Sequence, residues 1–215
     1  AFDKGNKTFR NDIFSEYKGT RQKTPMELSA QIPALHELAE AMGICLLEAD
    51  GFEADDIIGT VSAKAAAEDF EVIVVTGDKD ALQLIDSNVC VHLTKKGISE
   101  MQCMDEQAFL DQYGFAPEKL IDLKGLMGDT SDNIPGVPGV GEKTASKLLL
   151  EYGSLENVLE NIEQISGKKL KERLTEFGEQ AVLSKKLATI VRDMPLDFNM
   201  DTYVMQPDRK KMEDF

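Results

Sequence analysis

The pattern of hydrophobic and polar positions predicts alternating strands and helices. Residues 71–75 are a continuous run of mostly β-branched side chains bounded by turns, which is typical of a strand buried on both faces of a parallel sheet. The apolar run at 44–47 has strand length, and residues 89–94 followed by 98–102 predict a hairpin that turns at 95–97. These strands predict an α/β fold in which helices cover a mostly parallel central sheet.

Helical spacing of apolar residues recurs between these strands. In residues 24–43, Thr24 is a candidate N-cap that forms a capping box with Glu27, and Pro33 inside the pattern favours a kink. Further helices are expected after Glu53, at 105–114, at 117–127 and at 143–152. We expect an α/β core over 1–127, a C-terminal helical lobe over 128–195 with a helix–turn–helix motif, and a tail or linker over 196–215.

Charge is unevenly distributed along the 215 residues, whose net charge of −15 by itself argues against a nucleic-acid partner. Residues 4–23 carry six basic and two acidic side chains with interleaved aromatics, and residues 166–192 carry seven basic and three acidic ones. Such segments favour contact with a phosphate backbone, although a solvated surface gives the same pattern.

The three cysteines, Cys45, Cys90 and Cys103, are widely spaced among apolar residues. They lack the C-x-x-C spacing of common zinc sites, and we expect each to be a small core or half-buried residue in a reducing, cytoplasmic protein. His92 alternates with apolar neighbours and is interpreted as structural. No apolar run is long enough to span a membrane.

Acidic residues cluster at the edges of the predicted elements. Glu53-Ala54-Asp55-Asp56 opens a helix, where acids are also favoured by the helix dipole, so this cluster alone leaves a metal site and a capped helix open. Asp78 and Asp80 follow the clearest strand, at the end where ligands of open α/β sheets collect, and an Asx turn is the alternative. Asp129 and Asp132 precede a glycine-rich turn, and Asp3 stands near the start of the chain.

The turn at 136–141 contains three glycines and opens a helix at Lys143. Glycines at a helix N-terminus let backbone N–H groups approach a phosphate closely. Because Glu142 interrupts the P-loop pattern and no strand leads into the turn, an ATPase is excluded. A helix–turn–helix that grips a DNA backbone and a simple turn between helices both stay open.

Eight acids without cysteine or histidine partners form a hard oxygen donor set, which predicts Mg²⁺ or Mn²⁺. This number suits two ions about 4 Å apart. Two such ions beside phosphate-binding segments predict phosphodiester hydrolysis.

Five ordered motifs over roughly residues 1–195 resemble the 5′-nuclease domain of bacterial DNA polymerase I, a relative of flap endonucleases. The motifs are Phe2-Asp3-Lys4-Gly5, Glu16-Tyr17-Lys18-Gly19-x-Arg21, Glu53-Ala54-Asp55-Asp56, Thr76-Gly77-Asp78-x-Asp80 and Gly128-Asp129-x-x-Asp132-Asn133-Ile134-Pro135-Gly136. The resemblance implies a 5′→3′ exonuclease and flap endonuclease that removes RNA primers and 5′ flaps in replication and repair. It also implies a bacterial cytoplasmic monomer, a polymerase domain in the parent chain, and a further metal-binding Asp on a strand upstream of Phe2-Asp3.

The resemblance also implies roles for individual residues. The first metal would be held by Asp3, Glu53, Asp55 and Asp56, and the second by Asp78, Asp80, Asp129 and Asp132. The segment at 4–23 would form the helical arch over the 5′ strand, in which Lys18 and Arg21 steer the scissile phosphate. DNA would be contacted by Arg10, Tyr17 (as a stacking residue), Lys18, Arg21, Gly136, Gly139, Gly141, Lys143, Thr144 and Lys147, with K⁺ at the turn. A non-catalytic, metal-dependent binder of branched DNA and an acidic ion-binding protein are the alternatives.

Overall fold

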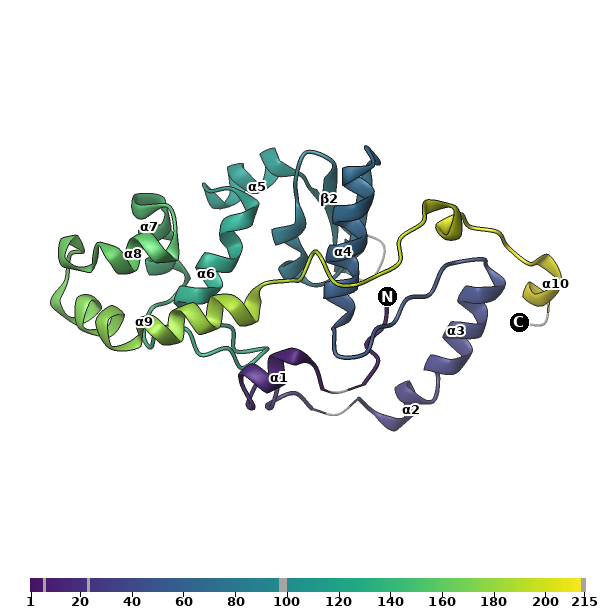
Figure 1. Ribbon diagram of the computed structural model, residues 1–215, viewed down its shortest axis with the longest axis horizontal. Helices are drawn as coiled ribbons and strands as arrows, with labels where there is room; N and C mark the ends of the chain where they lie inside the picture. The colour runs from purple at the N-terminus through teal and green to yellow at the C-terminus, as the bar shows by residue number, and fades with distance from the viewer. Residues whose placement is uncertain (6, 23, 97–99, 214–215) are drawn as a thin grey trace.

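The computed structural model describes residues 1–5, 7–22, 24–96 and 100–213. A sheet region with its covering helix α4 (Ala54–Ala67) occupies the middle of an elongated molecule, and a helical lobe lies at one end (Figure 1). The other end contains three short helices, α2 (Met26–Ser29), α3 (Ile32–Ala41) and α10 (Arg209–Met212). In the described part of the chain, no helix is both long and apolar enough to cross a membrane.

The sheet has the order β1 (Val72–Thr76), β2 (Val89–Lys96), β3 (Glu100–Met104). β1 pairs with β2 in parallel and β2 pairs with β3 antiparallel, so the sheet is small and mixed. The predicted α/β class and the predicted hairpin are confirmed. The hairpin connection at 97–99 lies outside the described residues.

One face of the sheet packs into the core and the other is partly open. Val74, Val91 and Leu93 are buried, whereas Ile73 and Val75 are each 57% exposed. The expectation that this strand is buried on both faces is therefore wrong. A continuous apolar run gives no strand-face alternation from which an open face can be read.

The predicted strand at 44–47 is not formed. Its segment is extended but belongs to no sheet of the described residues, and it accepts one backbone hydrogen bond, from Phe2 N–H to the Leu47 carbonyl at 2.9 Å. Four apolar residues are too short a signal to distinguish a strand from a connecting segment, and Ile44 and Cys45 are in fact exposed.

The single kinked helix predicted at 24–43 is also corrected. The segment forms α2 and α3, and Pro33 lies in the first turn of α3, where the missing N–H is not needed. Pro25, not Thr24, is the N-cap residue of α2, and no side chain caps that end. Pro33 therefore starts a second helix instead of bending the first.

Other helix boundaries follow their local signals. The Asp105 carboxylate accepts the Ala108 N–H at 2.8 Å and caps α5 (Glu106–Tyr113), which ends at the left-handed Gly114. The 3₁₀ turn η2 (Pro117–Lys119) leads into α6 (Leu120–Met127), as predicted.

The helical lobe comprises α7 (Glu142–Tyr152), α8 (Leu155–Glu160), η3 (Ile162–Gln164) and α9 (Lys168–Ala188). α6 packs against α9 so closely that a Cβ on Gly125 would lie 2.9 Å from the Cβ of Lys185. Lys185 forms ion pairs with Asp122 and Glu156, and Lys171 pairs with Glu163. Part of the basic charge at 166–192 thus stabilises the lobe, contrary to the expectation of a phosphate-binding segment.

Residues after Met194 return along the molecule to the far end. They contain η4 (Met200–Tyr203) and α10, and the Asp208 N–H donates to the Ala41 carbonyl at 2.8 Å. The C-terminal segment, which the sequence predicted as a tail or linker, therefore packs against α3.

Candidate metal centre

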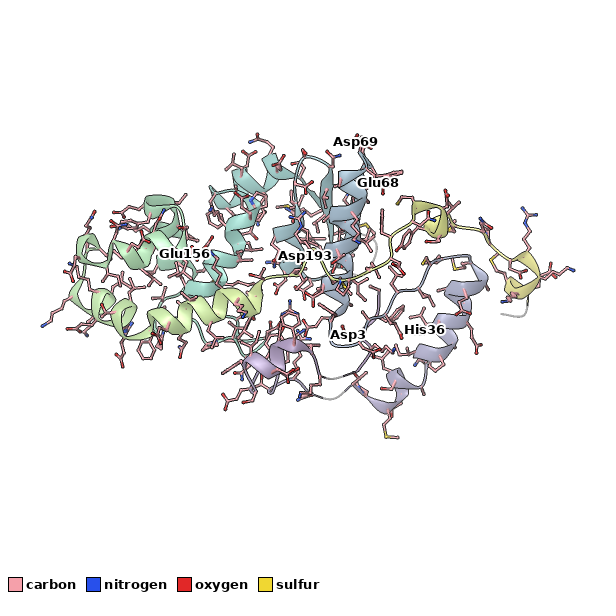
Figure 2. The ribbon with its side chains drawn as sticks, in the orientation of Figure 1. Asp3, His36, Glu68, Asp69, Glu156 and Asp193 are labelled. Atoms are coloured by element: carbon pink, nitrogen blue, oxygen red, sulfur yellow. The ribbon has the colours of Figure 1, made fainter. Side chains whose placement is uncertain are left out.

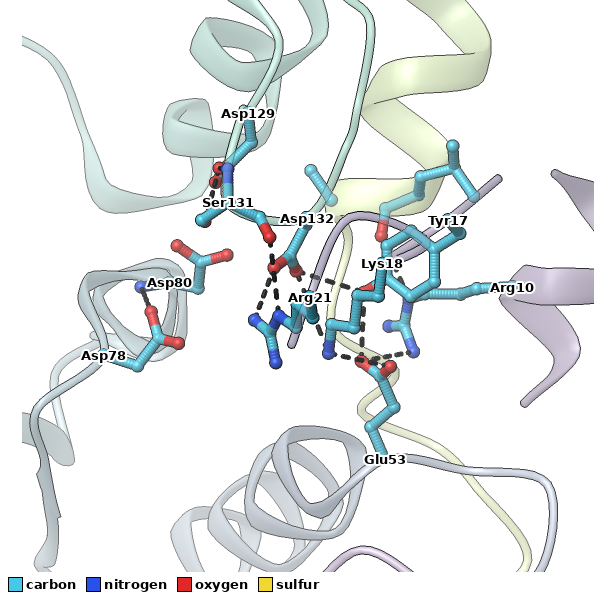
Figure 3. Close-up of polar contacts among 12 residues, drawn as sticks. Arg10, Tyr17, Lys18, Arg21, Glu53, Asp78, Asp80, Asp129, Ser131 and Asp132 are labelled. Carbon is cyan, nitrogen blue, oxygen red and sulfur yellow. Dashed lines mark hydrogen bonds and ion pairs between the residues drawn. The ribbon is translucent and has the colours of Figure 1, made fainter. Parts of the chain in front are cut away.

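Six of the eight predicted carboxylates gather around one cleft. Glu53, Asp55, Asp80 and Asp132 line a narrow cavity, and Asp78, Asp80 and Asp129 line the adjoining cleft of about 440 Å³. Figure 3 shows Glu53, Asp80 and Asp132 pointing toward a common space from three different parts of the chain. Asp80 lines both cavities and joins the two groups that the sequence predicted.

A tight turn after β1 sets the positions of Asp78 and Asp80. The Asp78 carboxylate accepts the Asp80 N–H at 2.9 Å and begins η1 (Lys79–Leu84), while the Thr76 hydroxyl accepts the Asp78 N–H at 3.0 Å. The Asx turn that the sequence offered as an alternative is therefore present. It holds Asp78 and places the Asp80 side chain in the cleft.

A closed loop presents the second acidic pair. Asp129 and Ile134 exchange two backbone hydrogen bonds of 2.7 and 2.8 Å, and Ser131 donates to Asp129 through both its N–H and its hydroxyl. Asn133 has a φ of +56°, a conformation that asparagine tolerates better than most residues, and its amide donates to the Glu16 carbonyl. The loop is thus fixed both internally and against the N-terminal segment.

The crowding of carboxylates changes their acidity. Burial, together with the neighbouring Asp78, raises the pKa of Asp55 to about 6. Burial also raises the pKa of Asp80 to about 6, although the Lys124 ammonium acts in the opposite direction. Both carboxylates are therefore held in a place that disfavours uncompensated negative charge.

Lys124 supplies part of the compensating charge. Its ammonium contacts Asp80 closely and lies 2.5 Å from an Asp129 oxygen. Although burial opposes it, the hydrogen bonds from Lys124 and Ser131 to Asp129 lower the pKa of Asp129. The sequence analysis did not single out Lys124. A lysine in a mostly apolar helix, 120–127, was the available signal.

Lys18 and Arg21 contact two of the carboxylates that line the narrow cavity. The Lys18 ammonium is 2.8 Å from Glu53 and 3.8 Å from Asp132, and Arg21 bonds Asp132 at 2.5 Å. Lys18 has a φ of +54°, and its N–H donates to the Asp132 carbonyl at 2.8 Å. Holding a lysine in this sparsely populated conformation has an energetic cost, which the surrounding contacts offset.

Tyr17 and Arg10 are buried, contrary to the expectation that both contact DNA. The Tyr17 hydroxyl lies 3.1 Å from Glu53 and 3.3 Å from Asp132, and its ring packs in a small core with Ile134 and Leu187. Arg10 is the second residue of the five-residue helix α1 (Phe9–Ile13) and is only 2% exposed. The N-terminal basic segment therefore packs on the core at these positions.

Asp56 lies beneath the cleft in a closed hydrogen-bond network. Its two oxygens accept both terminal nitrogens of Arg10 at 2.7 Å, the Glu53 N–H at 3.0 Å and the Val191 N–H at 2.9 Å. Although burial opposes it, the Arg10 guanidinium lowers the pKa of Asp56. Asp56 thus holds Glu53 and α4 in place and does not face the predicted metal.

Asp3 lies at the N-terminal end of α4, where its carboxylate accepts the Ala54 N–H at 2.7 Å. Figure 2 shows Asp3 at the end of α4 opposite to Glu68 and Asp69. The same helix end begins with Glu53 and contains Asp55, so Asp3 is adjacent to the first group of carboxylates.

The glycine-rich turn divides into a buried and an exposed part. Gly136 is buried, its N–H donates to the Ser184 hydroxyl and its carbonyl accepts from Gln180, so it does not face a partner molecule as predicted. Gly139, Gly141 and Lys143 are exposed at the start of α7, and Thr144 is half-buried behind them. The exposed part is accessible to a partner molecule.

A second groove of about 670 Å³ adjoins the acidic cleft. Both are lined by Lys79, Tyr113 and Glu142, and the groove continues over Lys143 and Lys147 of α7. A path lined by lysines therefore leads from the carboxylates to the exposed turn. Lys79 is a further residue that the sequence analysis did not single out.

The donor set at the cleft fits hard divalent cations. The cleft-facing acids provide oxygen donors only, and burial raises the pKa values of two of them, Asp55 and Asp80. Carboxylate oxygens are the preferred ligands of Mg²⁺ and Mn²⁺.

Family models match the chain in two consecutive parts. Residues 1–114 match the N-terminal resolvase-like domain of 5′-3′ exonucleases, and residues 115–211 match their C-terminal SAM-fold domain. This chain belongs to the 5′-3′ exonuclease family. The predicted family and its nuclease class are therefore confirmed.

Individual relatives agree with this family. DNA polymerase I of Bacillus caldotenax is 54% identical over 213 residues, which are 99% of this chain and 24% of that protein. T5 5′-exonuclease with bound zinc superposes with a TM-score of 0.70 at 24% identity, covering 86% of this chain and 71% of that one. The catalytic core of Rad2 in complex with DNA gives 0.64 at 18% identity, covering 99% and 69%. The chain spans about a quarter of the length of the curated relatives it matches.

Proposed function

We propose that this chain is the nuclease part of a longer protein and hydrolyses phosphodiester bonds at DNA 5′ ends and 5′ flaps with two divalent cations. The observation that carries the proposal is the convergence of carboxylates from separate segments beside Lys18 and Arg21. Removal of RNA primers and displaced strands, in a bacterial cytoplasmic protein with a polymerase domain, follows from the polymerase I relatives as part of the same proposal.

The carboxylates divide into two sets of metal ligands. Asp3, Glu53 and Asp55 at the start of α4 would hold one Mg²⁺ or Mn²⁺ ion, and Asp78, Asp80, Asp129 and Asp132 the other. Asp56 is assigned a positioning role because its oxygens are already occupied by four donors. When bound, such ions lower the pKa of water and stabilise charge on the attacked phosphate.

The chain's own cations would orient the substrate. Arg21 presents a planar set of donors suited to two phosphate oxygens, and Lys18 adds a second positive charge on the same side of the cleft. Their present partners, Glu53 and Asp132, hold both side chains toward the cleft. The Arg10–Asp56 pair fixes Glu53 from below and so preserves this arrangement.

The lysine-lined groove gives the duplex a path from the cleft to α7. Lys79, Lys143 and Lys147 would contact phosphates without reading bases, and the exposed Gly139–Gly141 part of the turn would admit the backbone closely. The expected K⁺ ion at this turn and the monomeric state stay predictions.

The packing of α6 on α9 favours counting α6 with this DNA-binding lobe, although the sequence pattern placed the boundary at 127–128.

The direct test is cleavage of a 5′-labelled flap DNA in Mg²⁺ or Mn²⁺ by this chain and by a version extended upstream of Ala1, each with and without Asp78→Asn. We expect metal-dependent release of the flap that Asp78→Asn reduces at least about 100-fold, because a metal ligand is lost. Tight flap binding without cleavage by either version would instead support the non-catalytic DNA-binding alternative.

A further inference from the structure

The open face of the sheet contains a second cluster of metal-ligating side chains. Along β2, Val89, Val91 and Leu93 point into the core, so Cys90 and His92 point to the opposite face. This is also the face on which Ile73 and Val75 of β1 are exposed, since they pair with Cys90 and His92. The cluster is therefore outside the hydrophobic core.

The antiparallel register adds a third ligand from β3. His92 stands directly opposite Cys103, and Cys90 lies two residues from His92 on the same face, diagonal to Cys103. One ligand atom of each side chain, two sulfurs and an imidazole nitrogen, lies within 4.8 Å of the others. Strand pairing thus brings together residues whose spacing in the sequence matches no zinc motif.

We propose that Cys90, His92 and Cys103 bind a thiophilic divalent cation of the Zn²⁺ class, at a site separate from the carboxylate centre. Two thiolates and one imidazole are a donor set that favours Zn²⁺ strongly over Mg²⁺ or Mn²⁺. The nuclease cations would therefore not compete for this site, and the two centres select different metals by their donor atoms.

The geometry needs only small side-chain adjustments. Zn–S and Zn–N distances of about 2.3 and 2.0 Å place the ligand atoms of a tetrahedral site about 3.5–4 Å apart. The ligand atoms lie within 4.8 Å of one another, and rotation about χ1 of the cysteines and χ1 and χ2 of His92 would bring them to these separations. All three side chains are partly accessible. Asp105, which follows β3, is close enough to Cys90 to contribute to its raised pKa, although burial is the larger cause.

The expected consequence is a link across the β2–β3 hairpin. Cys90 and His92 are on β2 and Cys103 is on β3, so one ion would connect both strands at the open face. A ligand that binds only the folded state raises its stability by mass action. Zn²⁺ would thus stabilise this part of the sheet independently of DNA and of Mg²⁺.

The test is titration of the fully reduced protein with Co²⁺ in excess Mg²⁺, followed by displacement with Zn²⁺. Thiolate ligands give Co²⁺ a charge-transfer absorption that carboxylates do not, so the readout is specific for the cysteine site. We expect one equivalent of Co²⁺ to produce this band and Zn²⁺ to abolish it. Cys103→Ser and Cys90→Ser should each weaken Zn²⁺ binding about 100-fold, since a thiolate ligand is lost.

Two controls separate this site from the rest of the molecule. Cys45→Ser removes the remaining cysteine, which is exposed and outside the cluster, and should leave the band unchanged. Asp78→Asn weakens the carboxylate centre and should also leave it unchanged. Absence of the band at stoichiometric Co²⁺, or a Co²⁺ titration of Cys103→Ser that matches wild type in band intensity and affinity, would overturn the proposal, whatever the outcome of the flap-cleavage test.

Discussion

At the scale of single residues, neighbouring acids in the Glu53-Ala54-Asp55-Asp56 cluster have opposite roles. Asp56 is fully buried and neutralised by Arg10, while Asp55 faces other carboxylates and has a pKa raised to about 6. The sequence alone left a metal site and a capped helix as alternatives. The structure shows the capped helix, because Glu53 and Asp56 form the capping box, and it places Asp55 in the narrow cavity beside other carboxylates.

Arg10→Ala is expected to destabilise the fold strongly. It leaves the Asp56 carboxylate buried without its cation, and removal of one partner of a buried ion pair costs about 3–5 kcal/mol. Urea unfolding measures this loss. The matched control is Arg192→Ala, whose partner Asp86 is partly exposed, and it should cost no more than about 1 kcal/mol. Equal losses in the two variants would contradict the structural role of Arg10.

The raised pKa of Asp55 makes stability depend on pH in a defined direction. Because the folded protein binds this proton more tightly than the unfolded chain, the contribution of Asp55 is favourable at low pH and is lost as pH rises from about 4 to about 6. Unfolding free energies measured in the presence of a metal chelator should therefore be similar for wild type and Asp55→Asn at low pH. Above about pH 6, Asp55→Asn should be the more stable of the two. An unfolding free energy of wild type that exceeds that of Asp55→Asn by more as pH rises would contradict this prediction.

At the scale of elements, local signals predicted the boundaries that depend on a few adjacent residues. Asp105 and Gly114 mark the two ends of α5, and the exposed part of the turn at 139–141 precedes α7. Contacts between residues far apart in the chain could not be predicted from the sequence. Arg10 meets Asp56 across 46 positions, and Cys90 meets Cys103 only through the β2–β3 register. The open face of β1 likewise depends on which elements pack against it.

The turn glycines have separable roles that matched substitutions distinguish. Gly136→Ala forces a Cβ into the backbone at Gly128 at a φ of +58°, and should destabilise the lobe by more than about 2 kcal/mol. Gly141 has open space around its Cβ position and caps α7, so Gly141→Ala should cost at most about 1 kcal/mol. Its added methyl should nevertheless weaken DNA binding. Thermal unfolding and DNA affinity together test this pair, and unchanged affinity in Gly141→Ala would argue against close backbone approach.

At the scale of the whole molecule, the net charge of −15 and a DNA substrate are compatible because the charges are segregated. Several acids of the cleft form ion pairs with Lys18, Arg21 and Lys124, and lysines line the adjoining groove. Part of the basic charge on α9, by contrast, is paired within the lobe, through Lys171 and Lys185. Net charge by itself therefore does not exclude the proposed DNA substrate.

The groove predicts a specific salt dependence. Lys143→Ala should lower DNA affinity and reduce the slope of log affinity against log salt by about 0.9, the value for one lost phosphate contact on duplex DNA. Lys168→Ala is the control, since Lys168 begins α9 away from the groove and is 90% exposed beside Glu172. Equal slopes for wild type and Lys143→Ala would exclude this path for the duplex.

The most direct test of the central claim is a titration with Mn²⁺ followed by electron paramagnetic resonance, in which bound ions lose the signal of the free ion. Mn²⁺ prefers oxygen ligands, so the cysteine site does not interfere. We expect wild type to bind up to two ions, Asp78→Asn to bind them at least about tenfold more weakly, and Asp86→Asn, an acid outside the cleft, to match wild type. Binding by Asp78→Asn equal to that of wild type would contradict the assignment of the cleft as the metal centre.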